Sequence, residues 1–166
     1  MYMGVMMKLT GAVCILFPLV IFTAGLFLKK ANKRTRWSKI FIFVLYIGVI
    51  LYLTVLRREE GSVHEFVLKP FWSYAEAHDP QYRWQIYMNI FLFIPFGFML
   101  GWTMNRKFLQ TLLIGLIFSA LLEVVQYIFC LGLCETDDVI HNTLGTVIGY
   151  EYWNMLRRLV KKRRSE

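Results

Sequence analysis

Long runs without a charged residue constrain this chain more than any other feature. Leu9–Leu28 contains 20 residues and no charge, and Ile40–Leu56 adds a second uncharged run of 17 residues. A helix needs about 20 apolar residues to cross the hydrocarbon core of a bilayer. With 57% hydrophobic residues and a mean hydropathy of +0.49, the chain is too apolar for an ordinary soluble domain. We therefore expect residues 1–166 to form one integral membrane domain.

Three further apolar segments complete the expected set of membrane spans. They cover Ile86–Asn105, Phe108–Leu133 and Asp138–Leu156. The sequence thus predicts an all-α integral membrane protein with five transmembrane helices. The first run, Leu9–Leu28, is followed by a basic segment and lacks a clear small-residue cleavage site. It is therefore expected to be a transmembrane helix and not a cleaved signal peptide.

Positive charge is unevenly distributed along the chain and predicts its orientation. Residues 29–39, 105–107 and 157–166 hold six, two and six Lys or Arg residues, which is 14 of the 19 in the chain. Basic residues beside membrane spans stay on the cytoplasmic side. This places the N-terminus outside and the C-terminus in the cytoplasm. The same rule accounts for the formal charge of +8, so no nucleic-acid partner is expected.

Polar side chains gather near the expected outer ends of the last three spans. Charged groups are costly in hydrocarbon and face a bundle interior or a wet cavity. Helical rise puts Glu123 about 12 Å and His141 about 6 Å below the outer surface. We expect these side chains to line a cavity open to the outside. The candidate ligand-binding residues are Asn89, Glu123, Gln126, Asp137, Asp138, His141 and Asn142.

Two more specific roles are predicted, one in catalysis for members of this set and one in helix packing for two nearby glycines. Glu123 is the first candidate for a catalytic acid or base, with His141 and Asp138 assisting it. Gly145 and Gly149 form a GxxxG pair, which lets another helix approach closely. No cofactor and no resident metal are expected, because zinc-ligand spacing and the H-E-x-x-H motif are absent.

Each polar candidate also has a structural interpretation. Asp137 or Asp138 could cap the N-terminus of the fifth helix. Gln126 and Asn142 could form hydrogen bonds between helices, as polar residues in membrane bundles do. A histidine at position 141 is compatible with simple core packing.

The pairing of Glu123 and the role of the loop before the third span are also open at this stage. Glu123 could be paired with Arg57, Arg58 or His141. The connection over residues 57–85 is rich in charged and aromatic residues, which suits the headgroup region. We expect Leu68–Tyr74, with the sequence LKPFWSY, to be an interfacial or re-entrant segment lying over the bundle.

Four stretches resemble the motifs of the VanZ-like family. They read LKPF (Leu68–Phe71), NIFLFIPFG (Asn89–Gly97), LLEVVQ (Leu121–Gln126) and ETDDVIHNTLG (Glu135–Gly145). The resemblance runs from about Thr54 to Tyr152. It departs at Leu68–Lys69, where the family has Asn-Leu-Ile, and at Gly132–Cys134, where many members carry an arginine.

The resemblance implies a small multi-pass protein of the bacterial cytoplasmic membrane. The namesake of the family is associated with resistance to the glycopeptide antibiotic teicoplanin, and no established mechanism accompanies it. Three hypotheses follow. The first is a protein that binds membrane lipids, a lipid-linked wall precursor or a lipoglycopeptide at the outer leaflet. The second is an intramembrane enzyme that acts on an envelope lipid, and the third is a structural or accessory membrane subunit. The sequence leaves the oligomeric state open.

Overall fold

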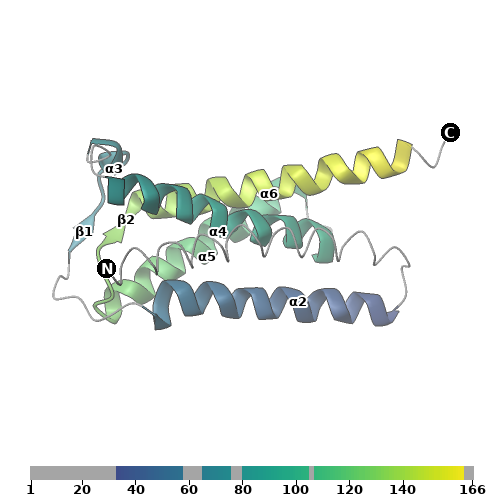
Figure 1. The fold of residues 1–166 in the computed structure, drawn as a ribbon, viewed down its shortest axis with the longest axis horizontal. Coiled ribbons are helices and arrows are strands. Elements are labelled where there is room, and N and C mark those ends of the chain that lie inside the picture. The colour runs from purple at the N-terminus through teal and green to yellow at the C-terminus, as the bar shows by residue number, and fades with distance from the viewer. Residues whose placement is uncertain (1–32, 58–64, 76–79, 105–106, 163–166) are drawn as a thin grey trace.

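Helices that run alongside one another dominate the computed structural model, which describes residues 33–57, 65–75, 80–104 and 107–162 (Figure 1). A parallel pair of two-residue strands lies at one end of the bundle. The predicted first span, Leu9–Leu28, lies outside the described residues. The elements are α2 (Lys33–Leu51), the π-helical turn η1 (Tyr52–Leu56), β1 (Phe66–Val67), α3 (Trp72–Ala75), α4 (Pro80–Met104), α5 (Phe108–Ile128), β2 (Cys134–Glu135) and α6 (Thr136–Lys162).

Three of the described helices are long and apolar enough to cross a membrane. They are Arg36–Leu56, Tyr82–Met104 and Phe108–Ile128, and they coincide with the predicted second, third and fourth spans. The structure thus confirms a largely helical chain with membrane-length apolar helices. The total of five spans and the orientation of the termini stay predictions.

The predicted fifth span corresponds to α6, which is long enough to cross a bilayer but is not apolar all round. Its 27 residues extend for about 40 Å at the α-helical rise. Its exposed large apolar side chains include Leu144, Ile148, Met155 and Leu159, which recur at helical spacing on one face. The opposite face is polar or glycine and packs against α4 and α5. This division explains the low overall hydropathy of the helix.

The fourth predicted span is five residues shorter than expected, because α5 ends at Ile128 and not at Leu133. The N–H of Leu131 donates to the carbonyl of Gln126, and the N–H of Cys130 donates to the carbonyl of Tyr127. Cys130 has a left-handed φ of 52°. This is the hydrogen-bond pattern of a Schellman motif, which ends a helix. This motif usually has glycine at the left-handed position. Because Cys130 occupies that position here, the sequence did not indicate the end of the helix.

Close backbone contact between α4 and α6 sets the arrangement of the bundle. A Cβ atom built on Gly145 would lie 2.2 Å from the carbonyl oxygen of Ile90, and one on Gly149 would lie 1.8 Å from that of Ile94. Both distances are far below van der Waals contact, so only glycine fits. The GxxxG spacing predicted a close helix contact but did not name the partner among the predicted helices. In the structure the two glycines face the third, α4, while α6 also packs against α5.

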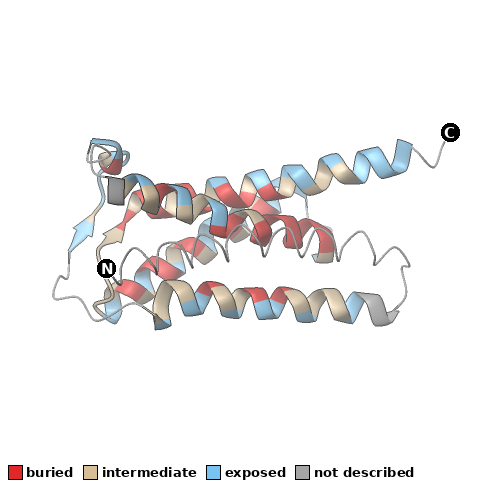
Figure 2. Ribbon diagram, in the orientation of Figure 1, coloured by how far each residue is buried: buried red, intermediate tan, exposed pale blue. Residues whose placement is uncertain are grey.

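The apolar core lies mainly between α2 and α4. Tyr46, Ile50, Phe93 and Met99 are fully buried there, and the hydroxyl of Tyr46 donates to the backbone carbonyl of Leu92. Figure 2 shows buried residues along α4 and on the inner sides of its neighbours, whereas the C-terminal part of α6 is exposed. The polar residues discussed below are buried away from this core, towards one end of the bundle.

Replacing Gly149 with alanine is expected to destabilise the protein by about 2 kcal/mol, because the new methyl group overlaps the backbone of α4. The matched control is Gly48→Ala on α2, where a Cβ atom meets nothing within 4 Å. That change should be neutral or stabilising, by up to about 1 kcal/mol of helix propensity. The check is the thermal unfolding midpoint of each purified variant in the same detergent. Equal midpoints for the two variants would contradict the packing described here.

Candidate functional site

The predicted polar residues of α5 and α6 come together at the end of the bundle that carries β1, β2 and α3 (Figure 1). Each of them is at least 96% buried, and Asn89 on α4 is half-buried. We call this group the polar cluster. Its members are Asn89, Glu123, Gln126, Asp137, Asp138, His141 and Asn142.

Asp137 ties the segment before α3 to the start of α6. One carboxylate oxygen accepts the backbone N–H of Phe71, and the other accepts both the backbone N–H and the hydroxyl of Ser73. Phe71 has a left-handed φ of 63°, which is uncommon for a bulky residue. Three donors on one carboxylate hold the chain in this conformation. The segment Leu68–Tyr74 is therefore anchored to α6 by a buried carboxylate, and its interfacial or re-entrant placement stays a prediction.

The anchoring hydrogen bonds also change the acidity of Asp137. Burial alone would raise the pKa of this carboxyl group, but the hydrogen bonds from Ser73 and Phe71 and the nearby His141 lower the pKa below its usual value. Because α6 begins at Thr136, Asp137 and Asp138 lie in its first turn and not at its capping position. The positive end of the helix dipole favours a carboxylate in this turn as well.

Glu123 connects α5 to the turn that leads into α6. Its carboxylate accepts the backbone N–H of Glu135 at 2.9 Å. Burial raises the pKa of the Cys134 thiol, and the carboxylates of Glu123, Asp138 and Glu135 raise it further. Negative charge is therefore concentrated where β2 meets α6. The hydrogen bond gives Glu123 a structural role in positioning α6.

The remaining cluster residues contact four different elements. The imidazole Nε2 of His141 lies 3.0 Å from the hydroxyl of Tyr74 in α3. The amide of Asn142 donates to the hydroxyl of Ser119 in α5 at 2.8 Å. The side-chain amide of Gln85 in α4 donates to the carboxylate of Asp138 at 3.5 Å. The side-chain amide of Gln126 donates to the backbone carbonyl of Thr54 in η1 at 3.0 Å.

Several buried polar atoms of the cluster have no hydrogen-bond partner among the described residues. They are Nδ2 of Asn89, Oε1 of Gln126, Nδ1 of His141 and Oδ1 of Asn142. An unsatisfied buried polar group costs about 1–3 kcal/mol, and native proteins leave few of them. The polar cluster therefore retains hydrogen-bonding capacity that the part of the chain described by the structure does not use.

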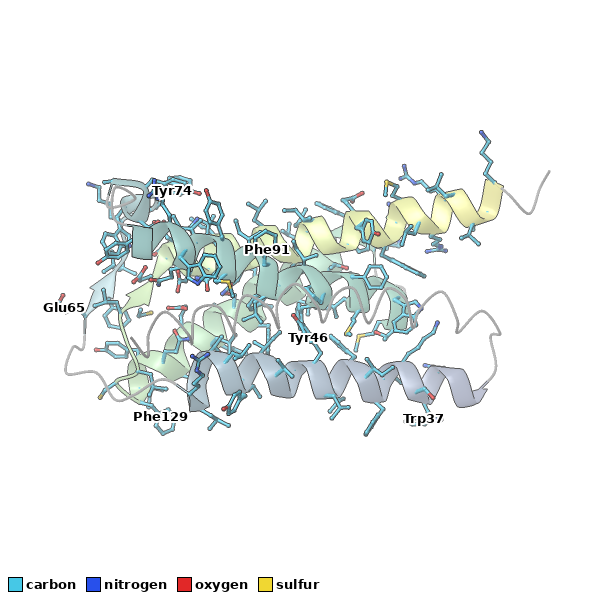
Figure 3. The ribbon with its side chains drawn as sticks, viewed as in Figure 1. Trp37, Tyr46, Glu65, Tyr74, Phe91 and Phe129 are labelled. Atoms are coloured by element: carbon cyan, nitrogen blue, oxygen red, sulfur yellow. The ribbon has the colours of Figure 1, made fainter. Side chains whose placement is uncertain are left out.

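Ser73, Tyr74, Gln85 and Thr54 contact the cluster but were not among the predicted site residues. Figure 3 shows Tyr74 at the same end of the molecule as Glu65 and Phe129, opposite Trp37. The signal for Tyr74 was the polar-aromatic composition of its loop, whereas nothing in the sequence pointed to Thr54. Within the described ranges, no three His, Cys, Asp or Glu side chains are grouped so that they could hold a metal ion.

Replacing Asp137 with asparagine is expected to loosen the segment before α3. The asparagine side chain keeps one acceptor oxygen, but its NH2 group faces backbone N–H groups that are also donors. The free energy of unfolding is therefore expected to fall by about 2 kcal/mol. Hydrogen exchange of the Phe71 and Ser73 amides should become faster. Exchange in α5 far from the cluster serves as the internal control, and unchanged protection at both amides would contradict the anchoring role.

The contribution of Asp137 should also depend on pH. Because the folded-state pKa of Asp137 is lowered, its stabilising effect is fully present above the unfolded pKa of about 3.9. It is lost as the pH falls through the lower folded-state pKa. The difference in unfolding free energy between wild type and Asp137→Asn should therefore persist at neutral pH and vanish only in strong acid. A difference that already vanished at pH 6 would contradict this assignment.

Comparisons with known proteins agree with the sequence motifs. The VanZ/LLP1 family model matches residues 43–157, a range that contains every member of the polar cluster. Protein VanZ of Enterococcus faecium is 30% identical to this chain over 135 residues, which cover 75% of this chain and 79% of the relative. No solved structure matches the chain. The chain is a member of the VanZ-like family.

Proposed function

We propose that this protein lowers the susceptibility of a bacterium to teicoplanin-type antibiotics by binding an envelope lipid or a lipoglycopeptide at the outer leaflet. The family membership and the similarity to Protein VanZ support this kind of function. The observation that carries the binding role is the set of buried polar atoms without partners in the polar cluster. They supply hydrogen-bonding groups that the described part of the fold leaves unused.

Exposed apolar side chains surround the polar cluster at its end of the bundle. Phe66, Leu68, Phe71 and Tyr74 are each more than half exposed, and all of them belong to the segment that leads into and forms α3. Aromatic side chains favour the interface between lipid and water. Such a surface suits contact with lipid headgroups, so a ligand can reach the cluster by lateral movement in the membrane.

The charge distribution supports placing this end at the outer surface. More of the described basic residues lie at the opposite end, with Arg36 and Lys39 in the first two turns of α2 and Lys161 and Lys162 in the last turn of α6 (Figure 1), than at the cluster end, where Arg57 follows η1 and Lys69 precedes α3. By the positive-inside rule this basic end faces the cytoplasm. The polar cluster then faces outwards in the cytoplasmic membrane, where glycopeptide antibiotics act.

The contacts divide the cluster into anchoring and ligand-facing residues. Asp137 and Glu123 accept backbone N–H groups and hold the start of α6 in place. His141 and Asn142 each have one buried polar atom that finds no partner within the described ranges of the chain. A purely structural cluster gains nothing from such atoms, because each one lowers stability. We assign the binding role to the second pair and the positioning role to the first.

Binding alone is sufficient for the proposed effect. A protein that holds the wall precursor, or the membrane-inserted part of the antibiotic, lowers the concentration of free partner at the outer surface. This requires no bond to break. The Glu123 carboxylate accepts a hydrogen bond from the backbone N–H of Glu135. This bond serves the fold, and an intramembrane enzyme would not require it of its catalytic acid or base.

Expression of the wild-type protein in a sensitive Gram-positive host should raise the teicoplanin concentration that inhibits growth. His141→Phe and Asn142→Leu are expected to abolish most of this protection, since they remove the polar atoms that have no partner among the described residues and keep a similar side-chain size. They also remove the contacts with Tyr74 and Ser119, so protection is compared at equal membrane abundance. Asn154→Leu, on the same helix beyond the cluster, is the matched control and should protect like wild type. Membrane abundance of each variant is measured by immunoblot.

Two results would count against the proposal. Absence of protection by the wild-type protein at normal abundance would remove the drug from the function. Full protection by both His141→Phe and Asn142→Leu would remove the cluster from the mechanism. Glu123→Gln separates binding from catalysis: protection in proportion to its abundance fits a positioning role, whereas complete loss at normal abundance fits an enzyme.

A further inference from the structure

The register between α4 and α6 brings Asn89 to the level of His141 and Asn142. Gln85 contacts Asp138 above this level, and the carbonyl of Ile90 faces Gly145 below it. Asn89 follows Gln85 by four residues, and Asn142 follows Asp138 by four residues. Residues four apart lie on the same face of a helix. The two asparagines therefore lie one turn beyond an observed contact, with the amide nitrogen of Asn142 directed to Ser119 of α5.

At this level, donors and acceptors are present together without bonding one another. Nδ2 of Asn89 is a donor, Oδ1 of Asn142 is an acceptor, and Nδ1 of His141 is either, depending on its tautomer. All three atoms are buried and have no partner among the described residues. A group that both donates and accepts hydrogen bonds is the chemical complement of such a set. Hydroxyl and amide groups have this property.

The charge of the surroundings argues against a phosphate group as the complement. The buried polar side chains of the described residues include four carboxylates, those of Glu123, Glu135, Asp137 and Asp138, and no lysine or arginine. Proteins bind phosphate with cationic side chains, above all arginine. A phosphate beside His141 and Asn142 would meet like charge instead. The polar cluster therefore suits a neutral group that forms hydrogen bonds.

Aromatic rings lie next to the same atoms. The Tyr74 ring lies 5.6 Å from the His141 ring, measured between centroids, and 6.0 Å from the Phe71 ring. The rings of Phe71 and Tyr74 are largely exposed. A sugar offers hydroxyl and acetamido groups for polar contacts, and it offers C–H faces for contact with aromatic rings. This combination matches what the structure places at this end of the bundle.

We propose that Asn89, His141 and Asn142 recognise the neutral hydroxyl and amide groups of a sugar carried by an amphiphile of the outer leaflet. This inference rests on the proposed function and specifies which part of the ligand is recognised. Sugars are common to both ligand classes, because lipid-linked wall precursors and lipoglycopeptides both carry amino sugars. The lipid or acyl chain then lies outside the cluster, against the exposed apolar side chains.

The experiment measures binding to the full-length protein in nanodiscs made of phosphatidylcholine and phosphatidylglycerol. Detergents with sugar headgroups are avoided, because they would compete for the proposed site. Two pairs of probes are titrated while tryptophan fluorescence is followed. The first pair is a polyprenyl pyrophosphate with and without the wall-precursor disaccharide. The second pair is teicoplanin and a sugar-free aglycone that carries the same acyl chain.

At least one sugar-bearing probe is expected to bind at least tenfold more tightly than its sugar-free partner, and the pair that shows the preference identifies the source of the sugar. Asn89→Leu and Asn142→Leu should reduce this preference at least tenfold, whereas Asn154→Leu should preserve it. The thermal midpoint of Asn89→Leu should not fall, because this change removes a buried donor that has no partner among the described residues. Loss of binding without loss of stability distinguishes recognition from packing.

Three outcomes would overturn the inference. One is equal binding of sugar-bearing and sugar-free probes in both pairs. Another is an unchanged sugar preference in folded Asn89→Leu and Asn142→Leu proteins. The third is an absence of binding by all four probes. If sugar-bearing and sugar-free probes bind equally, or the variants keep the sugar preference, while the protein still protects cells against teicoplanin, the sugar recognition fails and the proposed function stands. An absence of binding by all four probes removes the binding role of the proposed function as well. Loss of protection in the susceptibility experiment would remove both.

Discussion

The backbone contact between α4 and α6 is the constraint on which the rest of the structure depends. Gly145 and Gly149 allow α6 to approach the carbonyls of Ile90 and Ile94. Helix pairs in membranes gain stability from such close packing, because lipid tails solvate apolar side chains as well as a protein interior does. The same contact sets the register of the two helices, and the register decides which polar side chains share a level. Packing and site formation therefore follow from the same glycines.

The polar cluster combines groups with opposite consequences for stability. Asp137 and Glu123 meet backbone N–H groups that lie at the ends of short elements, so each of these carboxylates compensates for donors that would otherwise lack partners. Atoms such as Oδ1 of Asn142 are buried without a compensating partner in residues 33–57, 65–75, 80–104 and 107–162. Residues at functional sites often make a protein less stable than other residues at the same positions would. The division of this cluster into satisfied and unsatisfied members follows that principle.

The membrane character, the approximate positions of the central helices and the clustering of polar residues were predictable because they depend on hydropathy and helical spacing. Phe108 is the predicted and the observed start of α5. Its end was not predictable, since Cys130 occupies a left-handed position where glycine is usual. The partner of the GxxxG pair was also missed, because spacing shows which face of α6 is small and not which helix covers it. The contact between Asp137 and Ser73 spans 64 residues, and no local pattern encodes a contact at that separation.

The anchoring of the segment before α3 depends on main-chain groups and on a single serine hydroxyl. Asp137 binds the N–H groups of residues 71 and 73, which every amino acid except proline can supply. Side chains at positions 68–72 are therefore free to change during evolution without loss of the attachment. The family resemblance already departs at Leu68–Lys69 while the attachment is present. The exposed surface of this segment can thus vary in sequence while its attachment to α6 is kept.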